Sequence, residues 1–161
     1  MTSRLDKSQT VEKLAFETDA GIGQRARIGL LVLQTDQTLE AEVAALMAIE
    51  GVALYHARLA NDAVVTPSTL ARMAEELPRA AELIAPSLGL AAIGYACTSG
   101  ATIIGETRVA EILAGIHPSV PCTNPLTAAK AALGALGAAR VGLVTPYTPD
   151  VTLAMQTNLS E

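Results

Sequence analysis

Aromatic side chains are scarce in this 161-residue chain, which has one Phe, three Tyr and no Trp. Half of its residues are nevertheless hydrophobic, so its core must be built from Ala, Leu, Val and Ile. No apolar run reaches the length of a membrane span without a Gly, a Pro or a charge, and the first residues lack the apolar stretch of a signal peptide. We therefore expect a cytoplasmic protein.

Cysteine and histidine are equally sparse, with two of each. Two cysteines do not form a disulfide framework, and His56 and His117 lie too far apart in sequence to form a recognisable metal site. The net charge is −5 and the basic residues do not cluster, which argues against nucleic-acid and membrane partners. No nucleotide-binding glycine motif is present. We expect a small-molecule partner and neither a metal nor a cofactor. A homodimer is one candidate assembly.

Apolar runs typical of buried strands alternate with helical patterns along the chain. Residues 1–24 lack a sustained period and are predicted to form an arm or a short helix. Thr-Pro and Asn-Pro pairs predict the beginnings of several helices. The alternation predicts a doubly wound parallel α/β sheet. The predicted strands are 26–33, 52–59, 90–96, a short one beginning at 120 and 140–145.

Two predicted strands begin in the same way, with Arg27-Ile28-Gly29-Leu30 and Arg140-Val141-Gly142-Leu143. We interpret them as equivalent strands of two lobes, although such a start is also common for any buried strand. The predicted organisation is an arm at 1–24, a first α/β lobe at 25–120 and the start of an incomplete second lobe at 121–161. A truncated two-lobed protein is then expected, and this piece alone is expected to be inactive.

A thiol and two hydroxyls follow the third predicted strand, as Cys97, Thr98 and Ser99, where a helical pattern begins. Free backbone N–H groups and the positive end of the helix dipole stabilise a thiolate or a bound carboxylate at such a junction. Cys97 is therefore the candidate nucleophile or base. The alternative is a small cysteine that fills space in the core.

Ligands of doubly wound sheets bind at the carboxyl ends of the strands. Three turns rich in hydrogen-bond donors are expected to meet there, and such donors suit a small carboxylate. Asp36 orients a substrate amine, acts as a second acid or base, or caps the next helix. Cys122 is a weaker candidate for the same rim, and Tyr55 and Tyr95 are expected to pack in the core. The three turns contribute Thr35, Asp36, Gln37 and Thr38; Cys97, Thr98 and Ser99; and Thr145, Tyr147 and Thr148.

The segments 31–40, 95–99 and 143–148 resemble motifs of the aspartate/glutamate racemase superfamily, in its branch of maleate cis-trans isomerases and arylmalonate decarboxylases. The closest likeness is to racemase-like proteins of ectoine utilisation. The resemblance implies two pseudo-symmetric lobes, a cofactor-free site between them and one catalytic cysteine in each lobe. Cys97 matches the cysteine of the first lobe, and no residue matches that of the second. Thr98, Ser99 and Tyr147 match positions that hold the substrate carboxylate.

The resulting hypothesis is a cofactor-independent racemase or cis-trans isomerase that acts on a small carboxylate or amino acid. The Cys97 thiolate would remove a proton next to the carboxylate or add to a double bond. Decarboxylases of the group lack the first-lobe cysteine, which favours isomerisation. Asp36 stands where maleate isomerases carry asparagine, so its charge favours an amino-bearing substrate such as ectoine or a product of its hydrolysis. The alternatives are a non-catalytic carboxylate-binding protein and a cysteine-dependent decarboxylase or hydrolase.

Overall fold

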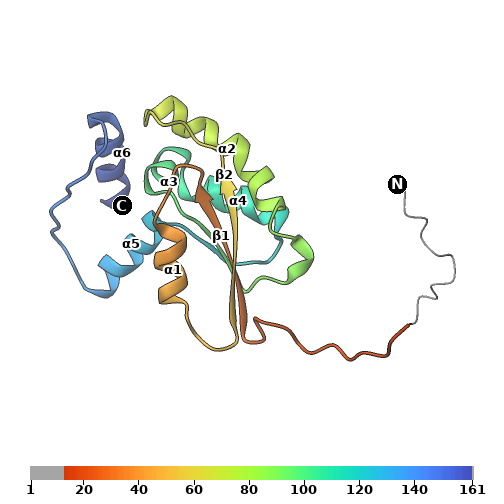
Figure 1. Ribbon diagram of the computed structural model, residues 1–161. Helices are drawn as coiled ribbons and strands as arrows, with labels where there is room; N and C mark the ends of the chain where they lie inside the picture. Colours follow the sequence, from red (N-terminus) through yellow and green to blue (C-terminus); the bar gives the residue numbers. More distant parts are fainter. Residues whose placement is uncertain (1–12, 161) are drawn as a thin grey trace, which may run out of the picture.

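The computed structural model describes residues 13–160 and contains a four-stranded parallel sheet in the order β2-β1-β3-β4 (Figure 1). The predicted doubly wound α/β class is therefore confirmed. The strands are β1 (Ala26–Leu33), β2 (Val52–Leu59), β3 (Ala92–Tyr95) and β4 (Cys122–Thr123). The helices are α1 (Leu39–Leu46), α2 (Pro67–Glu82), the 3-10 turn η1 (Pro86–Leu88), α3 (Thr98–Ile104), α4 (Glu106–Ile116), α5 (Pro125–Ala135) and α6 (Pro149–Leu159).

The sheet is organised around β1, whose eight residues all pair with β2 and whose other edge pairs with β3. Leu31 and Val32 of β1 are completely buried. Parallel neighbours need long crossover connections, which the helices between the strands provide. As predicted, β1 and β2 span residues 26–33 and 52–59.

The main core lies between the sheet and the layer formed by α2, α3 and α4. Thr66 caps α2 by accepting from the Thr69 N–H, and Pro67 occupies the first turn. One side of this helix is buried, through Leu70, Met73, Leu77, Ala80 and Ala81. In Figure 1, α1 lies on the opposite side of the sheet, and none of its residues is buried.

The predicted strand at 140–145 is wrong, because these residues form neither helix nor strand. Val144 is 96% exposed. A strand that is apolar on both faces needs a neighbouring strand and a covering layer. The described sheet ends at β4, and no described strand pairs with residues 140–145.

Two helix predictions also need correction. The single helix expected after Cys97 is divided into α3 and α4 at Gly105, whose φ of 92° is incompatible with a continuous helix. The periodicity also predicts that Leu126 and Leu136 face inward from a helix that begins at Pro125, but only Leu126 is buried, and Leu136, the C-cap residue of α5, is 79% exposed. An open groove of about 1370 Å³ lies between α5 and α6 and is also lined by residues 137–141 and Leu143.

The carboxyl-terminal segments pack on the same core as the first three strands. β4 pairs with β3, and Leu126, Val151 and Met155 are buried in the main cluster. The predicted boundary between residues 120 and 121 stays a prediction.

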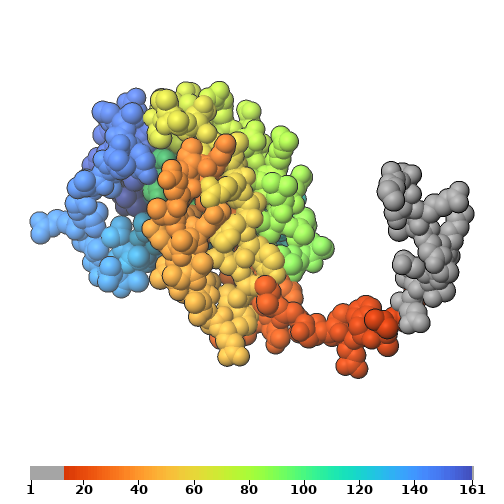
Figure 2. Space-filling view, viewed as in Figure 1, coloured from red at the N-terminus to blue at the C-terminus, as the bar shows by residue number. Residues whose placement is uncertain are grey.

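The amino-terminal part of the predicted arm, residues 1–12, lies outside the described residues. Residues 13–24 form no helix or strand, and Figure 2 shows them running away from the body of the molecule. Within residues 13–160, no helix is long and apolar enough to cross a membrane.

Candidate functional site

Cys97 is the N-cap residue of α3, with extended backbone angles that turn the chain from β3 into the helix. Its Sγ atom accepts a hydrogen bond from the Gly100 N–H at 3.2 Å, and the Ser99 hydroxyl lies 3.7 Å away. The side chain is only 5% exposed. The sulfur is therefore buried, but it is surrounded by polar donors and is not confined to aliphatic contacts.

Tyr95 lies two residues before Cys97 and packs in the hydrophobic core, as predicted. Its side chain is completely buried, and its hydroxyl donates to Met73 Sδ at 4.0 Å. Burial raises the pKa of the Tyr95 phenol, and the charge and hydrogen bonding of the adjoining Cys97 sulfur raise it further. The sequence signal that places Tyr95 near Cys97 is their spacing of two residues, because residues i and i+2 of a strand point to the same face.

Asp36 is committed to the start of α1. Its Oδ1 atom accepts hydrogen bonds from the N–H groups of Thr38 and Leu39, both at 2.9 Å. These two bonds, with that from Leu39 the stronger influence, lower the pKa of the Asp36 carboxyl. These bonds show the capping contact, and a contact of the same carboxylate with a substrate stays a prediction. Thr35 bonds instead to the Asn61 side chain beyond β2, while Gln37 is exposed.

The third turn lies at the beginning of α6. Tyr147 is partly buried against the core, and its N–H donates to the Thr145 hydroxyl at 3.4 Å. That hydroxyl also lies 2.6 Å from the hydroxyl of Thr152. Thr148 is the exposed N-cap residue of α6 and makes no side-chain capping bond.

Only part of the predicted cluster is brought together. Cys97 and Ser99 are in contact, with Thr98 between them in the first turn of α3. The ends of β1 and β3 are adjacent, because the Ala96 N–H donates to the Leu31 carbonyl at 2.9 Å. Within residues 13–160, however, no hydrogen bond or ion pair joins one of the three turns to another. Their convergence on one ligand stays a prediction.

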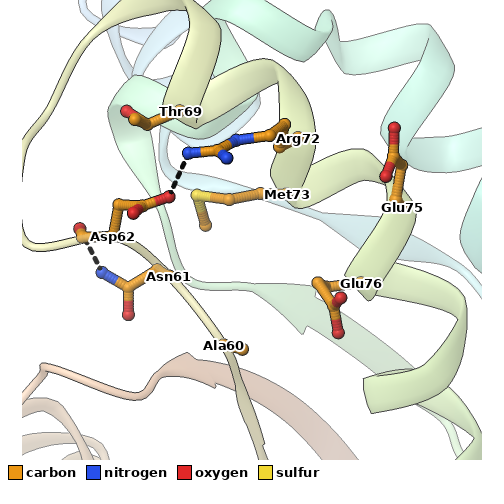
Figure 3. Close-up of a pocket in the computed structure, with 8 residues that line it drawn as sticks. All are labelled: Ala60, Asn61, Asp62, Thr69, Arg72, Met73, Glu75 and Glu76. Carbon is orange, nitrogen blue, oxygen red and sulfur yellow. Dashed lines mark hydrogen bonds and ion pairs between the residues drawn. The ribbon is translucent and has the colours of Figure 1, made fainter.

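A pocket of about 290 Å³ lies beside the start of α2, and its lining includes Asn61, Asp62, Arg72 and Met73 (Figure 3). The ion pair between Arg72 and Asp62, at 2.7 Å, crosses it. Cys97 lines neither this pocket nor the groove beside α5. In the described part of the chain, no group of three or more His, Cys, Asp or Glu side chains could hold a metal ion.

Replacing Asp36 by alanine is expected to lower the free energy of unfolding by about 1 kcal/mol at pH 7, because two helix N–H groups lose their acceptor. The Asp36 pKa is lowered on folding, so this stabilisation is present above the ordinary carboxyl range and is lost as the pH falls through the lowered value. The difference between the two proteins should shrink in acid. Urea unfolding at several pH values measures it.

Two variants control this experiment. Asp36→Asn keeps an oxygen acceptor and should retain most of the stability. Asp62→Ala breaks an exposed ion pair and should change stability by less than about 1 kcal/mol. An Asp36→Ala protein as stable as the parent at pH 7 would contradict the capping role.

Solved structures with the same fold include several maleate isomerases. The chain matches maleate isomerase Iso from Pseudomonas putida S16 at 25% identity with a TM-score of 0.70, over 83% of this chain and 58% of that one. It matches a Nocardia farcinica maleate cis-trans isomerase variant, with a covalently bound succinylcysteine intermediate, at 30% identity and a TM-score of 0.68, over 81% and 56% of the two chains.

An arylmalonate decarboxylase is also similar, at 25% identity and a TM-score of 0.62, over 84% of this chain and 57% of that one. The chain thus spans 56–58% of the length of these structures. Neither the protein-family models nor the curated protein sequences gave a match. In its fold, the chain is similar to the maleate isomerases and the arylmalonate decarboxylase, which represent this branch of the aspartate/glutamate racemase superfamily.

Proposed function

We propose that this chain carries the Cys97 half of a cofactor-independent isomerase or racemase that acts on a small carboxylate. The observation that supports this most directly is the Cys97 sulfur, which accepts the Gly100 N–H beside the Ser99 hydroxyl at the carboxyl end of β3. Backbone N–H groups at the start of a helix are donors of the kind that can bind a negatively charged atom. The solved relatives with this fold act on small carboxylic acids according to their names.

A single thiolate suffices for cis-trans isomerisation. The Cys97 sulfur would add to one carbon of the double bond, and the π electrons would move into the adjacent carboxylate as an enediolate. Rotation about the new single bond and loss of the thiolate would then give the trans product. Backbone N–H groups and the hydroxyls of Thr98 and Ser99 are the proposed donors to the enediolate, and Tyr147 is a further candidate.

Racemisation makes a further demand on the site. The thiolate would take the proton next to the carboxylate, and a second acid must return a proton to the opposite face. The resemblance implies one catalytic cysteine in each lobe, and only the first of these two has a counterpart in this chain, Cys97. Racemisation therefore requires a second proton donor, which faces the substrate and is not among the residues proposed here.

We further propose that the substrate carries an amino group, as ectoine or a product of its hydrolysis would provide. The support is Asp36, a carboxylate in the turn after β1, whose pKa is held low so that it is charged at neutral pH. Such a charge attracts an ammonium group and repels a second carboxylate. Thr35 and Gln37 flank it and complete the proposed contacts of this turn.

The test is proton NMR of small amino acids and of maleate incubated in heavy water with the full-length natural protein. Entry of solvent deuterium next to the carboxylate, or conversion between cis and trans acids, is the expected result. Saturable binding without either change would overturn the proposal in favour of a non-catalytic binding protein. Loss of carbon dioxide would identify a decarboxylase instead.

A further inference from the structure

The hydroxyl of Tyr95 is buried in the core beside two sulfur atoms. One is Met73 Sδ, at 4.0 Å, a long contact to a weak acceptor. The second sulfur is Cys97 Sγ, which lies against the same glycine, Gly100, as the phenol oxygen. A buried hydroxyl without a good acceptor is destabilising, yet Tyr95 is completely inaccessible to solvent. The site is therefore one where a better acceptor, such as a charged sulfur, would be favourable.

Gly100 allows the phenol to come close to the Cys97 sulfur. A Cβ atom at position 100 would overlap the Tyr95 hydroxyl oxygen and would lie 2.9 Å from Cys97 Sγ. Both atoms thus lie against the same side of Gly100. The Gly100 N–H also donates to this sulfur, at 3.2 Å. The sulfur therefore faces a backbone donor from α3 and a phenol donor from β3.

We propose that Tyr95 is a positioning residue for Cys97, whose phenol donates a hydrogen bond to the sulfur when it is a thiolate and to Met73 when the sulfur is protonated. A hydrogen bond to a charged acceptor is about twice as strong as one between neutral groups. The single phenol hydrogen therefore turns to the thiolate and holds both its charge and its orientation. The use of this contact in catalysis rests on the proposed function, whereas the contact itself does not.

The pH dependence of alkylation tests this inference without any substrate. The parent is the Cys122→Ser variant, so that iodoacetamide reports on Cys97 alone. We expect Tyr95→Phe to move the pH midpoint of alkylation upward by about one unit and to slow the reaction about tenfold below that midpoint. Phenylalanine keeps the packing and removes only the donor. An unchanged midpoint in a folded Tyr95→Phe protein would show that the residue only packs.

Two further variants keep the test decisive. Tyr55→Phe removes a phenol from a partly buried residue of β2 and should leave the midpoint unchanged. If Tyr95→Phe does not fold, Met73→Leu serves instead, because it removes the competing acceptor at nearly constant volume. The midpoint should then move to lower pH, and no movement would overturn the inference. If the midpoint of alkylation shifts as expected but the protein shows no turnover, the result contradicts the proposed function and leaves the inference on Tyr95 in place.

Discussion

Replacing Cys97 by serine is expected to reduce turnover by about a thousandfold or more in the full-length natural protein. A serine hydroxyl is a much weaker acid than a thiol, so almost none of it ionises at neutral pH, and it is also a poorer leaving group for the final step. The packing should survive, because serine is smaller and can still accept the Gly100 N–H. The measurement is the rate of deuterium entry or of isomerisation by proton NMR.

Cys122→Ser is the matched control. Cys122 lies in the edge strand β4, and burial raises the pKa of its thiol, which keeps it protonated at neutral pH. Its replacement should leave turnover within about a factor of two of the parent. Near-normal turnover by Cys97→Ser would exclude the thiolate mechanism, and a large loss from Cys122→Ser would place the chemistry nearer β4.

The sheet could be predicted because its signals are local. The apolar runs at 26–33 and 52–59 and the Thr66-Pro67 pair each specify one element by periodicity or capping, and the structure contains all three. Residues 140–145 carry an equally clear strand pattern and form no strand. A strand depends on partner strands that can be distant in sequence, and the local pattern does not show whether those partners are present.

The candidate site shows the same division between local and distant information. The position of Cys97 at the start of α3 follows from the change from a strand pattern to a helical pattern in the sequence. The hydrogen bonds that Asp36 accepts at the start of α1 come from residues only two and three positions away. For Tyr95 the strand pattern predicts only a buried aromatic residue. Its contact with Met73, 22 residues away, requires the fold.

Gly100→Ala is expected to destabilise the protein by about 2 kcal/mol, although alanine is the better helix former. The added methyl group would overlap the Tyr95 hydroxyl and crowd the Cys97 sulfur, and both are held in the core. Overpacking of this kind costs about 1 to 3 kcal/mol, whereas the gain in helix propensity is at most about 1 kcal/mol. Urea unfolding gives the difference, provided that the slopes of the two transitions agree.

Gly134→Ala in α5 separates crowding from helix propensity, because a Cβ there meets no atom within 4 Å. That variant should be as stable as the parent or more stable, by up to about 1 kcal/mol. Combining Gly100→Ala with Tyr95→Phe removes the overlapping oxygen and should restore about half of the lost stability, since the contact with Cys97 remains. Equal effects of Gly100→Ala with and without the phenol would show that Tyr95 and Gly100 are not in contact, and would remove the packing basis of the proposed Tyr95–Cys97 hydrogen bond.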